Sequence, residues 1–148
     1  MKFEFGVLVL AMCLGGCAST APDTEPVGAS DAASADLACL LPSNCVNSRG
    51  TGDLVPLRYI GTPEQAQGAL RATLATFPEA TVVRAEPLAL EAVFRTPVGF
   101  RDQVEFRIDA RQQRIDFRSR SLFGLFDFGK NRARMQEFAT RFEPRSRP

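Results

Sequence analysis

The sequence predicts an α+β domain of two layers, with an antiparallel sheet and helices on one of its faces, in the order β-α-β-β-β-β-α. Two observations lead to this prediction. Apolar residues recur at helical spacing in two stretches, one in the middle of the chain and one near its C-terminus. Between these stretches, apolar and polar residues alternate with a period of two, as in strands with one buried face.

The first predicted strand spans residues 55–61, and the helix after it has a clear start. Thr62 is the predicted N-cap, Pro63 takes the first helical position and Gln65 completes a capping box. The residues predicted to form its buried stripe are Ala66, Leu70, Leu74 and Phe77. Pro78 is expected to end this helix.

Two strands, 81–85 and 88–95, are predicted next, around Glu86 and Pro87. In the second strand the residues expected to point inward are Leu88, Leu90, Ala92 and Phe94.

A hairpin of strands 103–109 and 114–120, folded about Arg111 and Gln112, is the clearest pattern in the chain. The residues predicted for its buried face are Val104, Phe106, Ile108, Ile115, Phe117 and Ser119. The outward pairs expected from this register are Asp109 with Arg114, Arg107 with Asp116, and Glu105 with Arg118. Since every pair has opposite charges and a slip of one residue would expose the apolar face, the register is doubly specified.

A terminal helix completes the predicted fold, with Asp127 as its N-cap. The residues expected on its buried face are Asn131, Met135, Phe138 and Phe142.

Residues 1–16 have the layout of a secretory signal peptide, with Lys2 ahead of an apolar run over 5–14. This run is about ten residues long, whereas a membrane span needs about twenty. Residues 14–17, LGGC, resemble the bacterial lipobox, which implies that Cys17 becomes the lipidated first residue of the mature chain. Ordinary cleavage near residues 18–21 is the alternative.

By analogy with Gram-negative sorting, Ala18 after the lipidated cysteine favours the periplasmic face of the outer membrane. Residues 17–38 are rich in Ala, Ser, Asp and Pro and are predicted to form a flexible tether with a reach of roughly 25 Å. Residues 39–148 are predicted to form a single α+β domain.

Cys39 and Cys45 are the two thiols left once Cys13 departs with the signal peptide and Cys17 carries lipid. In an oxidising compartment we expect a disulfide between them. A metal pair would need two more ligands, and a redox couple usually has the closer Cys-x-x-Cys spacing.

The chain contains no histidine, which excludes a Ser-His-Asp triad, a Cys-His pair and histidine-based zinc sites. We therefore assign no catalytic residue, metal or cofactor, and lean against an enzyme. A nucleic-acid partner is not expected either, because the net charge is only +1 and an exported protein meets little nucleic acid.

Residues 119–134 contain four basic side chains without an obvious partner in sequence: Arg120, Lys130, Arg132 and Arg134. Three of them fall in the first turns of the terminal helix, where a cation is unfavourable unless an anion is bound. Gly124 and Gly129 would let the backbone approach such an anion closely. The alternative is that these side chains form salt bridges and the glycines only shape the turn.

Three segments, "SNCVNS", "FRDQVEFRI" and "RSRSLFGLFDFGKNRAR", resemble the uncharacterised bacterial domain-of-unknown-function family fourteen ninety-nine. The resemblance extends from Cys39 to Phe142. The positions that match its late motif are Arg118, Ser119, Ser121, Gly124, Asp127, Gly129, Asn131, Arg132 and Arg134. It identifies relatives and implies no activity.

Together these features predict an envelope lipoprotein that acts as a non-enzymatic binding or accessory module. Its expected partners are the membrane, through the N-terminal lipid, and a small anion or an envelope protein; the oligomeric state is left open. The alternatives are a histidine-free enzyme that acts on an anionic envelope substrate at residues 119–134, and a structural interaction module. A cleft at this loop would favour a ligand or substrate, whereas exposed Phe123, Leu125 and Phe126 would favour a protein or membrane contact.

Overall fold

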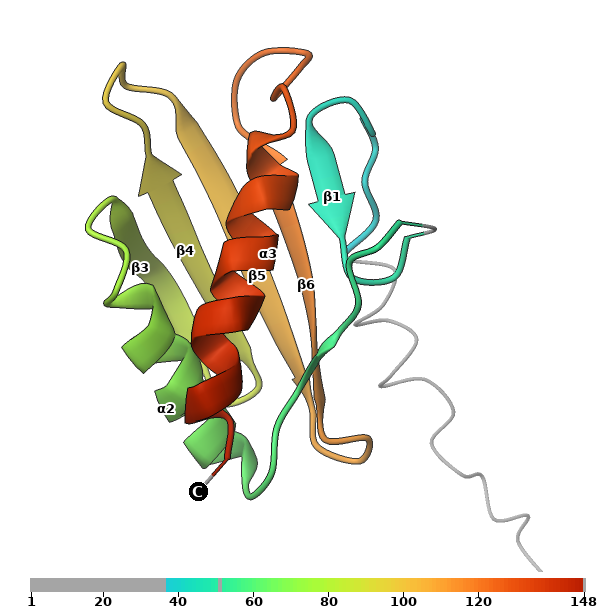
Figure 1. The fold of residues 1–148 in the computed structure, drawn as a ribbon, viewed down its shortest axis with the longest axis vertical. Coiled ribbons are helices and arrows are strands. Elements are labelled where there is room, and N and C mark those ends of the chain that lie inside the picture. Colours follow the sequence, from blue (N-terminus) through green and yellow to red (C-terminus); the bar gives the residue numbers. More distant parts are fainter. Residues whose placement is uncertain (1–36, 51, 148) are drawn as a thin grey trace, which may run out of the picture.

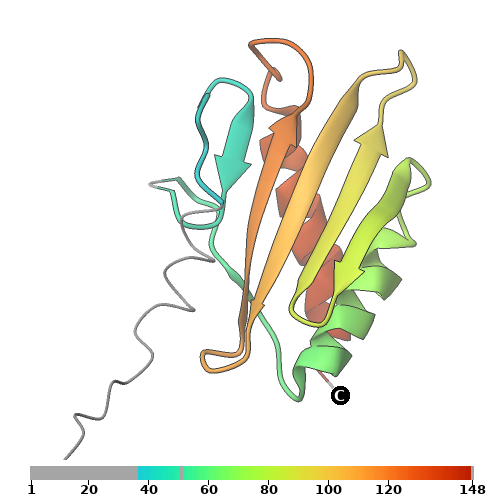
Figure 2. The ribbon, with the colours of Figure 1, turned by 180° about the vertical axis from the view of Figure 1, so that it is seen from behind.

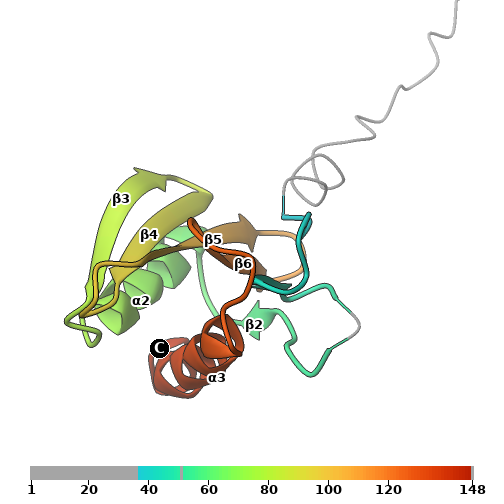
Figure 3. The same cartoon turned by 90° about the horizontal axis from the view of Figure 1, so that it is seen from above.

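The computed structural model describes residues 37–50 and 52–147. They form a six-stranded antiparallel sheet with two helices that lie against the same face (Figure 1). The view from behind shows the strands in front of both helices (Figure 2), and the view from above shows the two layers (Figure 3). The predicted α+β class is confirmed. The predicted signal peptide, Cys17 and the tether as far as residue 36 lie outside the described residues.

The strands are β1 (Cys45–Asn47), β2 (Leu57–Arg58), β3 (Ala80–Glu86), β4 (Ala89–Arg95), β5 (Arg101–Asp109) and β6 (Arg114–Ser121). The helices are α2 (Pro63–Leu74), α3 (Lys130–Phe142) and the short 3-10 helix η1 (Glu143–Arg145). The strand order across the sheet is β1-β6-β5-β4-β3, and β2 pairs with the opposite end of β6. From β2 onward the elements follow the predicted order β-α-β-β-β-β-α, and β1 is an additional strand ahead of them.

The first predicted strand, 55–61, is paired only over Leu57–Arg58. Pro56 has no N–H and cannot donate to the ladder, so pairing cannot extend backward through it. Beyond the strand, the N–H of Ile60 donates to the carbonyl of Ser146 at 2.9 Å. The chain therefore leaves β6 and joins the C-terminal turn.

The capping box that starts α2 is confirmed. The Thr62 hydroxyl accepts from the Gln65 N–H at 3.3 Å, and the Gln65 side chain accepts from the Thr62 N–H at 2.8 Å. The predicted stripe on this helix is buried. The helix ends at Leu74 rather than at Pro78, because the N–H of Phe77 bonds the Leu74 carbonyl three residues back in a tighter turn.

The predicted β5–β6 hairpin has the expected register, with Asp109 opposite Arg114 and Glu105 opposite Arg118. Its predicted inward residues are all buried. The Arg118 and Glu105 side chains form an ion pair at 2.5 Å. Ion pairing across the outward face thus accompanies apolar burial on the inward face.

The β3–β4 hairpin matches the prediction except at Leu88. This residue was expected to point inward, but it is 48% exposed because it lies in the turn before β4 begins at Ala89. The other three predicted inward residues of β4 are buried.

Phe138 of α3 lies at the centre of the core. Its ring centroid is 4.9 Å from that of Phe106 on β5, 6.0 Å from that of Phe77 and 6.2 Å from that of Phe142. All four predicted residues on the buried face of α3 are buried. This packing holds α3 against the sheet and against the end of the segment that contains α2.

Three loops lie at the upper end of the molecule in Figure 1. They are residues 37–44 before β1, residues 96–100 between β4 and β5, and residues 122–129 between β6 and α3. The predicted disulfide between Cys39 and Cys45 is confirmed and closes the first loop, with an S–S distance of 2.03 Å.

Candidate functional site

Asn131, in the first turn of α3, joins several residues of the predicted motif. It is fully buried, and its side-chain carbonyl oxygen accepts from the Ser119 hydroxyl at 2.7 Å and from Arg134 at 2.8 Å. Its side-chain amide donates to the Asn44 carbonyl at 3.1 Å and to the Ser121 hydroxyl at 3.3 Å. This one amide therefore connects α3, β6 and the disulfide loop.

Asp102 on β5 is the acidic centre of the same group of residues. It is 3% exposed, and its carboxylate accepts from Arg134 at 2.5 Å and from the Ser121 hydroxyl at 2.7 Å. The Arg134 guanidinium also lies over the Phe94 ring, 4.8 Å from its centroid. A buried carboxylate is tolerated when a charged partner and a hydrogen bond compensate it, and both are present here.

We call these six residues the polar network: Asn44, Asp102, Ser119, Ser121, Asn131 and Arg134. Their polar atoms bond one another, so four of the predicted motif residues, Ser119, Ser121, Asn131 and Arg134, meet in a closed arrangement with Asn44 and Asp102.

The N-cap of α3 is Gly129, not Asp127 as predicted. The Asp127 carboxylate nevertheless accepts from the N–H groups of Gly129 at 3.0 Å and Asn131 at 2.9 Å. It thus satisfies backbone donors at the helix start from two residues upstream. Gly129 has φ 78° and Gly124 has φ 90°, in the left-handed region that glycine adopts without strain.

The other two predicted arginines reach separate protein partners, and the predicted lysine is exposed. Arg120 donates to the Gln103 side-chain oxygen at 2.6 and 3.0 Å, and Arg132 forms an ion pair with Asp53. Lys130 is exposed at the start of α3. The three arginines predicted for one anion site are therefore distributed over different acceptors.

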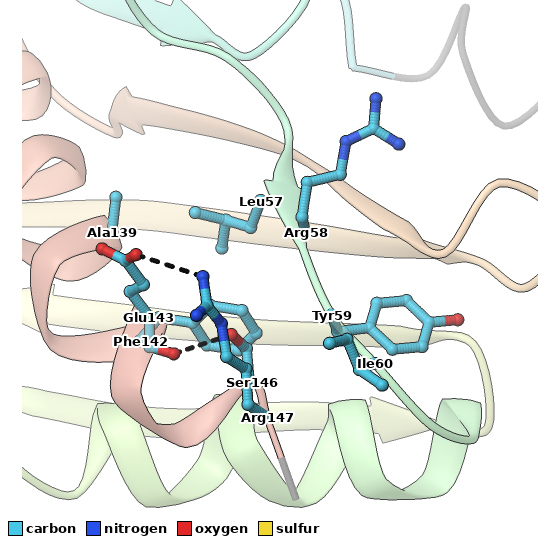
Figure 4. Close-up of a pocket in the computed structure, with 9 residues that line it drawn as sticks. All are labelled: Leu57, Arg58, Tyr59, Ile60, Ala139, Phe142, Glu143, Ser146 and Arg147. Atoms are coloured by element: carbon cyan, nitrogen blue, oxygen red, sulfur yellow. Dashed lines mark hydrogen bonds and ion pairs between the residues drawn. The ribbon is translucent and has the colours of Figure 1, made fainter.

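A groove of about 310 Å³ lies at the opposite end of β6, where β2 meets the C-terminal turn (Figure 4). Leu57, Ala139 and Phe142 supply its apolar lining. Glu143 and Arg147 form an ion pair at 3.5 Å beside Phe142. This groove contains no residue of the polar network.

Tyr59, which also lines the groove, has a raised pKa. Burial raises the pKa of its phenol, and the carboxylates of Asp109 and Glu64 raise it further. The Tyr59 hydroxyl donates to the Asp109 carbonyl at 3.4 Å. The neutral phenol is therefore the form that the fold stabilises.

The three loops at the upper end of the molecule expose a set of large apolar side chains, which we call the apolar end. Its members are Leu40, Leu41, Val98, Phe100, Leu122, Phe123, Leu125, Phe126 and Phe128. Phe128 is 92% exposed and Phe123 is 75% exposed. The described part of the chain exposes thirteen large apolar residues, and these nine are most of them. The exposed apolar surface is therefore concentrated on these three loops.

Direct contacts hold the loops of the apolar end together. The rings of Phe100 and Phe123 stack with their centroids 6.1 Å apart, which links two loops. The Ser43 hydroxyl donates to the Leu125 carbonyl, and the Asn44 amide donates to the Gly124 carbonyl at 2.6 Å. Asn44 thus belongs both to the polar network and to the support of the apolar end.

Sequence reasoning missed Asn44, Asp102, Gln103 and Asp53 as partners of the predicted motif. Two signals were available, because Asn44 lies in "SNCVNS" and Asp102 and Gln103 lie in "FRDQVEFRI". The pairing itself depends on the approach of segments that are distant in sequence.

Within residues 37–50 and 52–147, no cluster of three or more His, Cys, Asp or Glu residues is arranged to hold a metal ion. In the same residues no helix has the length and apolar character needed to span a membrane.

No curated protein matches this chain. One family matches residues 36–142, a range that contains the polar network, the three loops of the apolar end and the whole sheet. On this match, the chain belongs to the family described as protein of unknown function (DUF1499).

Proposed function

We propose that this protein is a lipid-anchored component of the bacterial envelope, at the periplasmic face of the outer membrane, and that its domain is a non-enzymatic binding or accessory module. Its binding surface is the apolar end. The observation that carries this proposal is the concentration of nine exposed apolar side chains on three loops at one end of the molecule. Exposed apolar clusters of this kind mark contact surfaces in soluble domains.

The polar network supports this surface and does not form an open site of its own. Its serine hydroxyls, the Asn131 amide and the Asp102 carboxylate bond one another or neighbouring backbone. Through Asn44 the network also bonds the loop that carries the exposed phenylalanines. We infer that the late sequence motif maintains the shape of the apolar end.

A small anionic ligand at residues 118–134 is less well supported. Arg120, Arg132 and Arg134 already donate to Gln103, Asp53 and Asp102, and an anion would have to displace these acceptors. The same point applies to an enzyme that would bind an anionic substrate there.

The anchor is tested by metabolic labelling with a lipid precursor. We expect the chain to incorporate the label and Cys17→Ser to lose it. If the Cys17→Ser protein still carries the label, Cys17 is not the lipidated residue.

The binding surface is tested by the reactivity of single cysteines in intact cells. With Cys39 and Cys45 in a disulfide and Cys17 acylated, an introduced cysteine is the one free thiol of the mature chain. We expect a small maleimide to label Phe126→Cys several-fold more slowly than Ile60→Cys, because a partner covers the apolar end. Both positions are exposed in the isolated fold, at 66% and 56%.

Unfolding the protein before labelling supplies the control, since both variants should then react at the same rate. Equal rates for the two variants in intact cells would contradict the proposed function.

A further inference from the structure

We infer that the apolar end docks on the anionic lipid surface of the membrane that carries the chain's own lipid anchor. This inference rests on the proposed function and names the partner of its binding surface. Two observations favour a lipid surface, the placement of the apolar side chains on loop tips and the charge around them, and the short predicted tether to the proposed anchor is consistent with it.

The apolar side chains protrude from loops rather than from the face of a helix or sheet. The loops that carry most of them connect β4 with β5 and β6 with α3, at the upper end of the sheet in Figure 1. Phe123, Phe126 and Phe128 lie within six residues of one another and are each at least 66% exposed. Aromatic and leucine side chains in this arrangement can enter the headgroup region while the domain stays in water.

The charge next to the apolar end suits an anionic surface. Arg95 and Arg101 are directly opposite each other on β4 and β5, and both are exposed. Like charges in such a pair destabilise a sheet unless an anion compensates them. Lys130 adds a third exposed cation directly after the loop of residues 122–129.

Acidic charge is nearly absent from the three loops themselves. Asp127 is their one acidic residue in sequence, and its carboxylate accepts from the N–H groups of Gly129 and Asn131. Anionic headgroups would therefore meet basic side chains with little opposing charge.

The predicted tether limits how far the domain can move from its membrane. The described chain begins at Leu37, which is buried and accepts a hydrogen bond from the side chain of Asn47, the last residue of β1, at 3.2 Å. The proposed anchor at Cys17 is twenty residues upstream of Leu37. If this segment is a flexible tether, as its composition predicts, it would reach roughly 25 Å and would hold the anchored domain at high effective concentration near its membrane.

The experiment uses a tryptophan as a reporter, because the chain contains none. Residues 18–148, exported with a cleavable signal peptide, leave the lipid out and keep every contact described above. Phe126→Trp places the reporter at the apolar end, and Ile60→Trp places it at another exposed apolar position, next to the groove.

On mixed phosphatidylethanolamine and phosphatidylglycerol vesicles, we expect the Phe126→Trp emission to shift to shorter wavelength and to be quenched by brominated acyl chains. The Ile60→Trp emission should stay unchanged. Unchanged emission at both positions, or equal changes at both, would overturn the inference.

Two sets of variants separate the apolar and the electrostatic contributions. Phe123→Ser and Phe128→Ser should each weaken vesicle binding by at least about tenfold, whereas Val83→Ser, at an exposed position on β3, should not. Arg95→Gln, Arg101→Gln and Lys130→Gln should each weaken it by about fivefold at low salt. Equal binding to phosphatidylcholine vesicles would overturn the inference of an anionic surface.

A second copy of the chain is the competing occupant. A blue shift of Phe126→Trp that grows with protein concentration in the absence of vesicles would overturn the membrane inference in favour of self-association.

The proposed function can be judged separately. If Phe126→Cys is protected in cells but no vesicle binds, the module has another partner and the membrane inference alone fails. If Phe126→Cys is not protected in cells, the proposed function fails.

Discussion

At the scale of single residues, Asn131 is the position on which the polar network depends most. Its side chain makes four hydrogen bonds, to Asn44, Ser119, Ser121 and Arg134, and it is fully buried. An asparagine supplies both a donor group and an acceptor group, which this position needs. An aspartate there would keep the acceptor and lose the donor to the Asn44 carbonyl.

We predict that Asn131→Ala lowers the free energy of unfolding by about 3 kcal/mol, because it leaves buried donors and acceptors without a partner. Urea denaturation measures this difference. The matched control is Lys130→Ala, one residue earlier and exposed, which should change stability by no more than about 0.5 kcal/mol. A loss as small as that of the control would show that water replaces these bonds without cost.

Tyr59 is the residue whose titration reports on the fold. It is the one tyrosine of the chain, and burial raises its pKa above the usual value of about 10, with Asp109 and Glu64 adding to the shift. Between the unfolded and the folded pKa, the folded protein keeps a proton that the unfolded chain has lost. The contribution of the neutral Tyr59 phenol to the free energy of unfolding is therefore fully present below a pH of about 10, and it is lost as the pH rises through the folded pKa.

We predict that the ultraviolet absorbance of the phenolate rises at a higher pH in the native protein than in urea. We also expect Tyr59→Phe to lose less stability between neutral and alkaline pH than the unaltered protein. Coincident titration curves in native and unfolded protein would contradict the raised pKa.

At the scale of elements, the disulfide loop and β1 form one segment that packs against the end of β6 and the loop after it. β1 pairs with the last residues of β6, and the Ser43 and Asn44 side chains bond the loop between β6 and α3. The Cys39–Cys45 bond closes this segment on itself. It therefore stabilises a loop of the apolar end rather than the core, in which neither cysteine takes part.

We predict that the double substitution Cys39→Ser with Cys45→Ser lowers the free energy of unfolding by about 2 kcal/mol, the value expected for so short a closed loop. Urea denaturation with and without reductant provides the measurement. Reductant should destabilise the unaltered protein by the same amount and leave the double variant unchanged. A reductant effect on the double variant would assign the loss to something other than this bond.

At the scale of the whole molecule, the two sets of phenylalanines have opposite roles. Phe94, Phe106, Phe138 and others are fully buried between sheet and helices, whereas Phe126 and Phe128 are exposed on one loop. The exposed Phe126 and Phe128 bury little apolar surface, so they contribute little to the stability of the fold. Their exposure is the reason for regarding the apolar end as a contact surface.

We predict that Phe126→Ser combined with Phe128→Ser changes the free energy of unfolding by less than about 1 kcal/mol, while Phe138→Ala lowers it by about 3 to 5 kcal/mol. Thermal or urea denaturation of the three proteins tests this. A large loss in the loop variant would mean that these rings pack within the fold and would remove the basis of the proposed binding surface.

Much of the fold could be predicted from local patterns. The alternation over residues 103–120, the capping box at Thr62 and the helical spacing of Met135 and Phe138 each constrain neighbouring residues, so they are visible in sequence. One error arose where a distant segment decided the outcome. The N–H of Ile60 bonds the C-terminal turn instead of extending the first predicted strand. The N-cap error has a local cause, because Gly129 adopts a positive φ two residues after Asp127 and the helix begins there.

By itself, the sequence determined the fold class, the register of the β5–β6 hairpin, the cysteine pair and, apart from Leu88, the residues of the buried faces. The reason is that the periodicity of apolar residues, the order of charges and the spacing of cysteines are set within short stretches of the chain. The tertiary structure alone decided the partners of Arg120, Arg132 and Arg134 and the position of the exposed phenylalanines. Arg132 meets Asp53 and Arg134 meets Asp102 only when chain folding brings together segments more than thirty residues apart. The same folding gathers three separate loops into one apolar surface, which no single stretch of sequence contains.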